Sequence, residues 1–301
     1  MQIEDFDYLL AVAEGGSISR GAELLGISQP ALTKAMRRIE ADVGLRLFER
    51  TAKGVVATEA GRSFIQRATR ISLEYSDAMQ EMHQIRTGEQ GVLRLGFSRT
   101  VNEQMVFAVC KLLLRERPVA RFELRERLTG ELMPMLRAGD LDLALAPLPH
   151  GETIDMQFIP LYSDHLYFVA ALDHPLRRRK SLGMRDLADA EWMLPPRDTR
   201  VRLHIDEMFR ARGMALPRIR IETDFGSGAT FSLVQGTQLL TICGDSSKNL
   251  LQALGLGTLD VAGASFGRDI GIMYRPEGYL SPLAQRVIEL FRQAGAGATP
   301  G

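Results

Sequence analysis

Residues 17–38 read SISRGAELLGISQPALTKAMRR, and their pattern is the most informative about the structure at the start of the chain. The spacing of its apolar residues predicts one short helix that ends at Gly26 and another helix that begins after Ser28. Serine is a residue type that caps helices, and Pro30 falls in the first turn, where a missing N–H does no harm. A helix with apolar residues at positions 6, 9, 10 and 13 precedes both. The pattern therefore predicts three helices, the last two joined by a tight turn.

The last of these helices is predicted to have two unlike faces, one apolar and the other polar and basic. The apolar face carries Leu32, Met36, Ile39 and Val43. Such a helix after a tight turn is the layout that places a recognition helix in the major groove of DNA. The alternative is a solvated face of some other helical protein, since residues 1–62 hold eight basic against nine acidic residues. Within residues 28–53, however, six basic residues outnumber three acidic ones, so positive charge concentrates on the groove-facing element.

Two short alternating apolar stretches lie within residues 45–58, around a Lys-Gly turn, and predict a wing. Basic residues of the wing would hold the sugar-phosphate backbone, which makes binding strongly dependent on salt. Side chains on the polar helix face would reach phosphates and base edges. The expected DNA-contacting residues are Ser28, Gln29, Pro30, Ala31, Thr33, Lys34, Arg37, Arg38, Arg50, Lys53 and Gly54.

Six segments form an ordered set of motifs that resembles the LysR-type transcriptional regulators. They are residues 17–25, 28–33, 39–40, 44, 47–50 and 58–61. Gly21, Thr33 and Ile39 depart from the residues common in that family, and Gly21 is expected to cost about 1 kcal/mol of helix stability relative to alanine. The resemblance implies a multi-domain α/β chain. An N-terminal winged helix-turn-helix would be followed by a long linker helix and by a two-lobed α/β effector domain similar to periplasmic binding proteins.

No proline interrupts residues 59–88, and apolar residues recur there with alternating spacings of four and three. A narrow stripe among polar residues favours a two-chain coiled coil over a single helix that lies on its own domain. The residues of this seam are Phe64, Ala68, Ile71, Tyr75, Ala78, Met82 and Ile85. A two-fold dimer would place two recognition helices on successive major-groove faces, so we expect an inverted-repeat operator. The resemblance implies the same linker helix, and family members often pair such dimers into tetramers.

After residue 91 the pattern changes to an alternation of strands and helices, which predicts parallel βαβ units. Ligands of such sheets bind at the carboxyl ends of the strands. The resemblance implies a DNA-binding domain at residues 1–58, a lobe I formed by residues 92–163 and 268–301, and a lobe II formed by residues 164–267. It also implies an effector in the cleft between the lobes, with second-lobe contacts carried over by position. The expected effector-binding residues are Ser98, Arg99, Thr100, Thr129, Gly130, Pro147, Arg197, Thr199, Arg200, Arg202, Phe225 and Ser227.

The arginines in this set bear on the chemistry of the effector. A guanidinium matches a carboxylate or sulfonate in both geometry and charge, so we expect an anionic effector. The alternative is that most of these arginines are surface residues. The Gly236–Cys243 segment also departs from the Gly-Leu-Gly-Ile run that is frequent in the family, which leaves the second-lobe contacts open.

Composition narrows the class of protein further. The 301 residues are 45% hydrophobic and 25% charged, and 37 basic residues balance 37 acidic ones, so bulk charge identifies no partner. No apolar run approaches the length of a membrane helix and the start lacks a signal-peptide pattern, so we expect a cytoplasmic protein. Cys110 and Cys243 lie far apart in apolar stretches and are expected to be buried, reduced thiols. The five histidines show no metal-ligand spacing and no nucleophile motif or phosphate loop is present, so we expect neither a cofactor nor an enzyme.

Two other function classes compete with a transcription regulator. A solute-binding module of a transport system would need export, and the sequence shows no signal segment. A small-molecule enzyme should show a catalytic constellation, and turnover of a bound ligand would reveal one. A regulator would bind double-stranded DNA, a small effector and a second copy of itself, and RNA polymerase is a further expected partner.

Overall fold

The structure is a computed structural model that describes residues 1–51, 54–87, 92–148, 156–223, 228–264, 266–276 and 278–296. The chain divides into two compact units. One comprises residues 1–89 with 277–279, and the other comprises residues 90–276 with 280–301. None of the described helices is long and apolar enough to cross a membrane.

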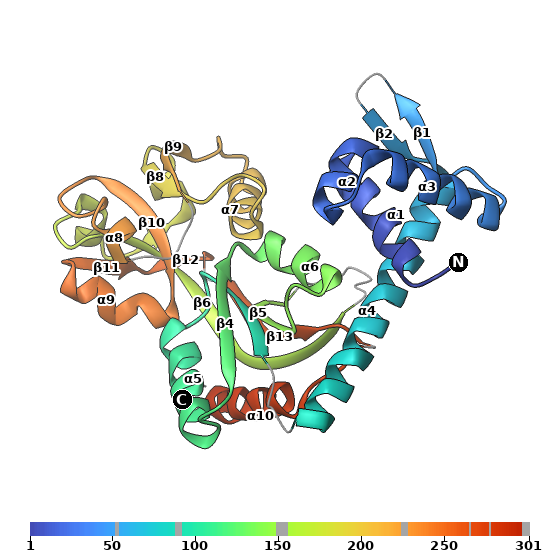
Figure 1. The fold of residues 1–301 in the computed structure, drawn as a ribbon. Coiled ribbons are helices and arrows are strands. Elements are labelled where there is room, and N and C mark those ends of the chain that lie inside the picture. The colour runs from blue at the N-terminus through green and yellow to red at the C-terminus, as the bar shows by residue number, and fades with distance from the viewer. Residues whose placement is uncertain are drawn as a thin grey trace. The chain divides into compact units, whose positions relative to one another are not determined.

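The first unit consists of helices and one two-stranded hairpin (Figure 1). The hydroxyl of Ser17 accepts the N–H of Arg20 at the start of the second helix, and that of Ser28 accepts the N–H of Ala31 at the start of the third. The predicted helix-turn-helix is therefore present. Its elements are α1 (Glu4–Gly15), α2 (Ile18–Leu25), α3 (Gln29–Val43), β1 (Phe48–Thr51), β2 (Gly54–Ala57) and α4 (Glu59–Thr87).

One apolar core holds this unit together. It collects the inward faces of the first three helices, of the segment before β1 and of the start of α4. The apolar face predicted for α3 supplies three of its most buried members. The fully or nearly fully buried core residues are Leu9, Val12, Ala22, Leu32, Met36, Ile39, Leu47 and Ala68.

Strands β1 and β2 form the predicted wing as an antiparallel hairpin, with Phe48 opposite Ala57 and Thr51 opposite Gly54. The hairpin is attached to the helices because the N–H of Val55 donates to the carbonyl of Gly16 at 2.8 Å. Gly54 has a φ of 132°, and a Cβ there would lie 2.4 Å from the same carbonyl oxygen. Only glycine combines this backbone conformation with this close approach.

The second unit alternates strands and helices, as predicted. Its first half comprises β3 (Val92–Ser98), α5 (Glu103–Glu116), β4 (Arg121–Arg127), α6 (Thr129–Ala138), β5 (Leu143–Pro147) and β6 (Gln157–Ala171). The middle comprises η1 (Pro175–Arg178), β7 (Leu182–Gly183), η2 (Met184–Leu187), β8 (Glu191–Leu194), α7 (Arg200–Arg210), β9 (Arg218–Glu222) and α8 (Gly228–Phe231). The last part comprises β10 (Leu239–Gly244), η3 (Asp245–Ser247), α9 (Lys248–Ala253), β11 (Leu256–Leu259), β12 (Val261–Ala262), β13 (Phe266–Tyr274) and α10 (Pro282–Ala296).

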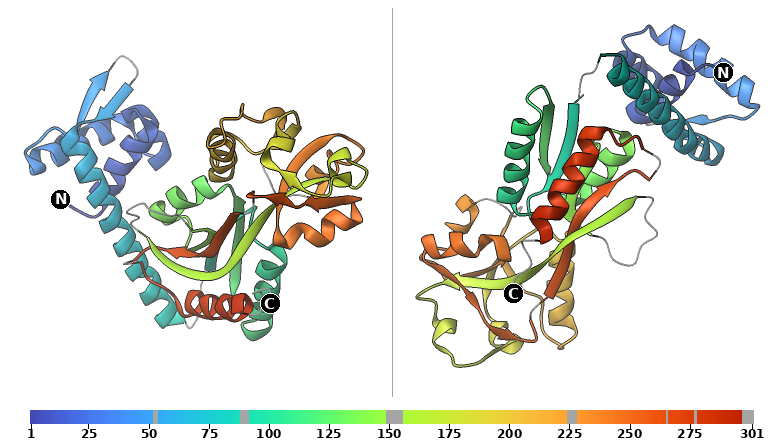
Figure 2. Two further views of the ribbon diagram at one scale, coloured as in Figure 1. Left: turned by 180° about the vertical axis from the view of Figure 1, so that it is seen from behind. Right: turned by 90° about the horizontal axis from the view of Figure 1, so that it is seen from below.

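A mixed sheet runs through this unit in the strand order β4-β3-β5-β13-β6-β10-β8-β9, with β11 on β6. Strands β3, β4 and β5 are parallel neighbours, and so are β8, β9 and β10. The long strands β6 and β13 pair antiparallel between these two groups, and Figure 2 shows β6 as one continuous curved strand. The two groups form two lobes that β6 and β13 connect.

Lobe I is the lobe around β3, β4 and β5. Helices α5 and α10 cover one face of its sheet with a core that includes Val106, Leu113, Val287 and Phe291. Helix α6 covers the opposite face through a separate cluster that includes Leu132 and Leu136. A sheet buried on both faces by helices is the arrangement expected of parallel strands.

Lobe II is the lobe around β8, β9 and β10, and it also has a core on each face of its sheet. Phe168 and Ala170 of β6 point to one face with Trp192 and Phe209, whereas Val169 and Ala171 point to the other. Cys243 lies in the second cluster, and both cysteines are buried free thiols, as predicted.

Candidate functional site

Helix α3 presents the expected polar face to solvent. Gln29, Lys34 and Arg37 are exposed, and Thr33 is half-buried. The Thr33 hydroxyl donates to the carbonyl of Gln29 at 2.9 Å, and the Gln29 amide donates to the Thr33 hydroxyl at 3.3 Å. Ser28, Pro30 and Ala31 at the start of the helix are also exposed. The start of α3 therefore offers amide, hydroxyl and cationic groups above a fully buried face.

Arg38 also has a structural role, which the helical pattern does not reveal. Its guanidinium forms an ion pair with the carboxylate of Asp5 in α1. The Asp5 side chain is only 1% exposed, and it also accepts the backbone N–H of Gln2 at 2.8 Å. Because a buried carboxylate needs a compensating charge, Arg38 joins α3 to α1 with part of the charge that the sequence assigns to DNA.

Of the three wing residues expected to contact DNA, the structure describes two. Arg50 is exposed in β1, Gly54 begins β2, and Lys53 lies outside the described residues. Glu40 of α3 anchors the segment before the wing, because its Oε1 accepts the N–H groups of Leu47 and Phe48 at 2.8 and 3.1 Å. Two charge-assisted hydrogen bonds from one side chain thus set the position of the wing relative to α3.

Only part of the predicted seam on α4 is available for a partner. Phe64 and Ala68 pack into the core of their own unit, where the ring of Phe64 lies 6.5 Å from that of Phe6. Ile71, Tyr75 and Met82 are instead about half exposed, at 46%, 49% and 53%. Ala78 is exposed too, and the side chain of Ile85 lies outside the described residues. The seam therefore divides into a short intradomain part and a longer uncovered part.

The second unit contains a cavity of about 290 Å³ between its lobes. Lobe I contributes residues 99–104, at the end of β3 and the start of α5. Lobe II contributes apolar side chains and the polar residues Ser246, Ser247 and Asn249, which follow β10. Arg268 of β13 completes the lining from the connection between the lobes. A concave, partly apolar site with a few convergent polar groups is typical of small-molecule binding.

The expected first-lobe residues gather beside this cavity. Arg99 and Thr100 line it. The Ser98 hydroxyl lies 2.9 Å from that of Thr100 and 3.0 Å from that of Thr129, so three hydroxyls from β3, its loop and α6 form one chain. Gly130 follows in α6, and Pro147 pairs with Ile270 at the end of β5. The structure thus brings Ser98, Thr100 and Thr129 together but places only Arg99 and Thr100 in the lining.

The expected second-lobe residues lie elsewhere. The Arg202 side chain is 1% exposed, and its Nε donates to Asp206 at 2.9 Å, so it neutralises a buried carboxylate within lobe II. The Thr199 hydroxyl accepts the N–H of Arg202 and donates to the carbonyl of Pro196, so it caps α7. Arg197 and Arg200 are exposed, and neither lines the cavity. Phe225 and Ser227 lie outside the described residues.

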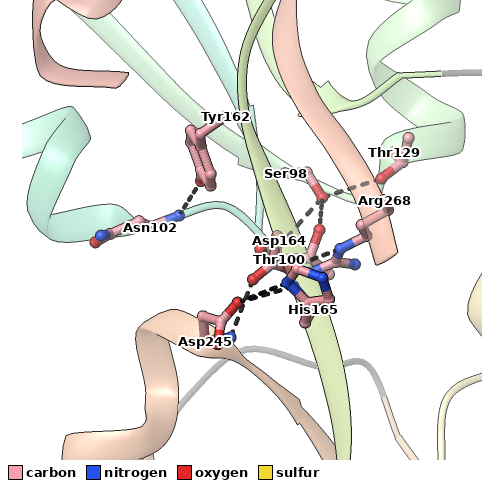
Figure 3. A network of polar contacts seen from close by, with 9 residues as sticks. All are labelled: Ser98, Thr100, Asn102, Thr129, Tyr162, Asp164, His165, Asp245 and Arg268. Carbon is pink, nitrogen blue, oxygen red and sulfur yellow. Dashed lines mark hydrogen bonds and ion pairs between the residues drawn. The ribbon is translucent and has the colours of Figure 1, made fainter. Parts of the chain in front are cut away.

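A network of polar contacts lies where the lobes meet (Figure 3), and sequence patterns did not point to its charged members Arg268, Asp164 and Asp245. Arg268 binds Asp164 through two nitrogens, at 2.8 and 2.6 Å, and donates to the carbonyl of Thr100 at 3.1 Å. Asp164 also accepts the N–H of Asp245 at 3.0 Å. The Asp245 carboxylate accepts the N–H of His165 at 2.9 Å and pairs with Lys248 at 2.8 Å.

Burial shifts the titration of several groups around the cavity. Glu103 has a raised pKa, because burial disfavours its charge and Glu126 lies nearby. Glu126 in turn pairs with Arg99 at 3.4 Å. Burial raises the pKa of the Cys243 thiol to about 12, so this cavity-lining cysteine is not a nucleophile near neutral pH. Among the residues that the structure describes, no group of three or more histidine, cysteine or acidic side chains is placed to hold a metal ion.

Comparison with known families decides the class of protein. Residues 3–62 match the family described as bacterial regulatory helix-turn-helix protein, lysR family. Residues 86–296 match the LysR substrate binding domain. The chain belongs to the LysR family. This LysR regulator therefore has a helix-turn-helix DNA-binding domain followed by an effector-binding domain, as the sequence resemblance predicted.

Individual relatives of the regulator agree with this assignment. It is 27% identical over 285 residues to the uncharacterized HTH-type transcriptional regulator YybE of Bacillus subtilis, covering 95% of this chain and 96% of that protein. It is 26% identical over 297 residues to the HTH-type transcriptional regulator GbpR of Azospirillum brasilense, covering 98% of this chain and 86% of that protein.

Solved structures show the same fold along the whole regulator. A full-length OxyR variant from Pseudomonas aeruginosa superposes with a TM-score of 0.65 at 19% identity, covering 98% of this chain and 94% of that chain. CbnR, a LysR family transcriptional regulator, has a TM-score of 0.60 at 22% identity, covering 98% and 99% of the two chains. Full-length CbnR is also known in complex with its target DNA.

Proposed function

We propose that this LysR regulator binds an inverted-repeat operator as a dimer and responds to a small organic acid bound between its lobes. The observation that carries the proposal is the pairing of two surfaces in one chain. Helix α3 exposes Lys34 and Arg37 above a buried face, and the second unit encloses a cavity lined by Arg99 and Arg268. The first surface suits DNA and the second suits an acid. In domain terms, we assign residues 1–58 to DNA, 59–88 to dimerisation, 92–163 with 268–301 to lobe I, and 164–267 to lobe II.

On the DNA side, we assign base and phosphate contacts to the exposed start of α3 and to Arg50 of the wing. Gln29 and Thr33 carry amide and hydroxyl groups suited to base edges, and Lys34 and Arg37 carry charges suited to phosphates or guanine. Arg38 contributes less, because Asp5 already binds its guanidinium. Lys53, which lies outside the described residues, remains part of the proposal from its place in the sequence between β1 and β2.

On the dimer side, we assign the interface to the uncovered part of α4. Ile71, Tyr75 and Met82 expose apolar surface at helical spacing, and a partner helix would remove that surface from water. Two copies joined in this way place two α3 helices for the two halves of a symmetric operator.

On the effector side, we assign the acid group to the guanidinium groups in the lining, with hydroxyls of Ser246 and Ser247 as further donors. The apolar part of the cavity, which includes Val101, Phe231 and Leu250, suits a hydrocarbon or aromatic body. We further propose that the regulator is not an enzyme, works in the cytoplasm and contacts RNA polymerase at its promoters.

Fluorescence anisotropy with labelled duplexes from the intergenic region upstream of the gene tests the DNA-binding part. Specific binding at low salt that weakens steeply with added salt is expected. Lys34→Ala should weaken binding, whereas the matched control Lys111→Ala, at an exposed position of α5, should not. A chain that binds no duplex in preference to a scrambled one contradicts the proposal.

Thermal unfolding in the presence of small carboxylates and aromatic acids tests the effector part. A ligand that binds only the folded protein raises its melting temperature, so at least one acid should do so beyond the effect of potassium chloride at equal ionic strength. If neutral analogues stabilise the protein and acids do not, the effector class is wrong.

A further inference from the structure

Strands β6 and β13 form the connection between the lobes, and two oppositely charged residues face each other at that point. Arg268 is paired with Asp164 in the antiparallel ladder, two positions before the register shifts between Ile270 and Gly271. Lobe I strands pair with the later half of β13, and lobe II strands pair with the later half of β6. Arg268 and Asp164 therefore lie at the crossover itself.

The guanidinium of Arg268 links groups of both lobes. Its Nη2 donates to the carbonyl of Thr100 in the cavity loop of lobe I. Its Nε and Nη2 hold the Asp164 carboxylate, whose other oxygen accepts the N–H of Asp245 in lobe II. A continuous chain of hydrogen bonds thus runs from Thr100 through Arg268 and Asp164 to Asp245 (Figure 3).

This chain is buried and closely fitted. The side chains of Arg268 and Asp164 are 11% and 5% exposed. A Cβ at Gly244 would lie 2.9 and 3.0 Å from the two oxygens of the Asp164 carboxylate, so Gly244 leaves the space that this carboxylate fills. If one member of a buried ion pair is removed, the other charge is left buried without compensation. The arrangement at this point therefore depends on both Arg268 and Asp164.

The same guanidinium is accessible from the cavity, because Arg268 belongs to the cavity lining. No described residue accepts a hydrogen bond from its Nη1, since the contacts of Arg268 use Nε and Nη2 alone. The two N–H groups of Nη1, on a guanidinium that is already oriented by Asp164, are thereby left for a bound molecule. An oriented donor loses little conformational freedom on binding.

We propose that Arg268 anchors the acid group of the effector through Nη1 and, through Thr100 and Asp164, couples occupancy of the cavity to the arrangement of the lobes. This inference rests on the proposed effector function and names the residue that performs it. An acid that binds Nη1 lies at the crossover and also meets Ser246 or Ser247 of lobe II, so its affinity depends on how the lobes are set. The arginines of α7 and of the segment before it have no part in this site.

The first arm of the test measures the lobe arrangement without ligand in the full-length protein. Spin labels at Arg115→Cys in lobe I and Asp189→Cys in lobe II report the interlobe distance, and an excess of unlabelled protein suppresses signals between protomers. Buried Cys110 and Cys243 are poor targets for the label. Arg268→Gln, Arg268→Lys and Asp164→Asn are compared with the control Arg94→Gln, which removes a partly buried pair with Asp142 at 2.8 Å inside lobe I.

The unmutated protein and Arg94→Gln should show the same narrow distribution of interlobe distances. In Arg268→Gln and Asp164→Asn this distribution should be broader or shifted. The distribution for Arg268→Lys should lie between those of the unmutated protein and Arg268→Gln, because an ammonium keeps the charge but lacks the planar set of donors that binds Thr100 and Asp164 together. Circular dichroism confirms that each variant is folded. A distribution for Arg268→Gln that equals that of the unmutated protein overturns the inference.

The second arm adds benzoate or sulfate as the acid probe. The unmutated protein and Arg94→Gln should show the same ligand-induced distance shift, and Arg268→Gln should lose it, with apparent affinity reduced about tenfold or more. A full response in Arg268→Gln overturns the anchor role while the proposed effector function stands. If neither probe affects the unmutated protein, the organic-acid part of the proposed function fails and the ligand-free arm alone decides the coupling role.

Discussion

Gly61 marks a place where two backbone segments meet with no room for a side chain. A Cβ there would lie 1.9 Å from the carbonyl oxygen of Leu47. The Thr58 hydroxyl at the same turn donates to the carbonyl of Arg46 at 2.8 Å and accepts the N–H of Gly61 at 2.9 Å. The start of α4 is therefore held against the segment that leads into the wing.

Gly61→Ala should lower the free energy of unfolding of the first unit by about 2 kcal/mol or more, because the backbone at Leu47 would have to move. Chemical denaturation followed by circular dichroism measures the loss. Gly130→Ala is the matched control, since a Cβ there meets no atom within 4 Å. Equal stabilities of the two variants would show that the wing and α4 are not packed as described.

Gly21 shows why helix propensity alone is an incomplete guide. Alanine at this position would gain about 1 kcal/mol of helix stability. A Cβ there would, however, lie 3.0 Å from the carbonyl oxygen of Ala11 and 3.1 Å from the Cα of Val12. The close approach of α1 and α2 opposes the propensity gain, and only the packed structure reveals it.

Glu103 should make effector binding depend on pH. Burial and Glu126 raise its pKa, so its charged form is already disfavoured, and an acid in the cavity would disfavour it further. Benzoate should therefore bind more tightly as the pH falls from neutral toward that raised pKa, because protonation removes the repulsion. Isothermal titration calorimetry at a series of pH values measures this. Glu103→Gln should bind benzoate tightly at every pH in this range. If the variant keeps the pH dependence of the unmutated protein, the assignment to Glu103 is wrong.

At the scale of the element, α3 divides into a face for packing and a face for DNA. Ile39 is fully buried and Lys34 is exposed on the same helix. The helical period predicted this division from spacing alone, because the backbone of one helix sets the direction of every side chain on it. The partner of Arg38 was not predictable in this way, since Asp5 lies 33 positions away in another helix.

Lys34→Ala should weaken operator binding and reduce the slope of log K against log salt by about one, with no loss of stability. Ile39→Ala should cost about 2–5 kcal/mol of stability through the cavity that it leaves. Anisotropy across a salt series and denaturant titration measure the two effects. If both substitutions act only on stability, the division of α3 into faces is wrong.

Helix α4 is the second element whose faces carry a prediction. Ile71→Glu and Met82→Glu place charge on surface that is about half exposed in one chain, so each chain should still fold. In a dimer that surface is buried, and each substitution should cost about 2 kcal/mol per side chain or more. Sedimentation should then show dissociation and anisotropy should show weaker operator binding. Gln66→Glu on the exposed polar face is the control, and a dimer that tolerates all three changes does not use this face.

At the scale of the whole molecule, the two units have separate apolar cores. The core of the first unit is built from residues up to Ala68, and the cores of the lobes begin at Leu93. Units with separate cores can unfold separately, and a ligand stabilises only the unit that binds it.

Calorimetry should therefore resolve two unfolding transitions. Operator DNA should raise the temperature of one, and a stabilising organic acid should raise that of the other, by an amount equivalent to about 2.7 kcal/mol at a hundredfold excess over Kd. The Gly61→Ala variant identifies the transition of the first unit. A single transition that both ligands raise together would show that the units fold as one.

Sequence patterns were enough to predict the winged helix-turn-helix, the linker helix and the alternation of strands and helices, because caps, turns and apolar periods act between residues that are close in the chain. It also located Arg99 and Thr100 at the end of β3, where a strand end directs the loop into the cleft. The packed fold was needed to show that Arg202 is buried within lobe II instead of lining the cavity, that Phe64 and Ala68 belong to the core of their own unit, and that Arg268 lines the cavity. The contact between Arg268 and Thr100 joins residues 168 positions apart. Patterns of capping, turns and apolar spacing act over a few residues, so they cannot predict a contact at this separation.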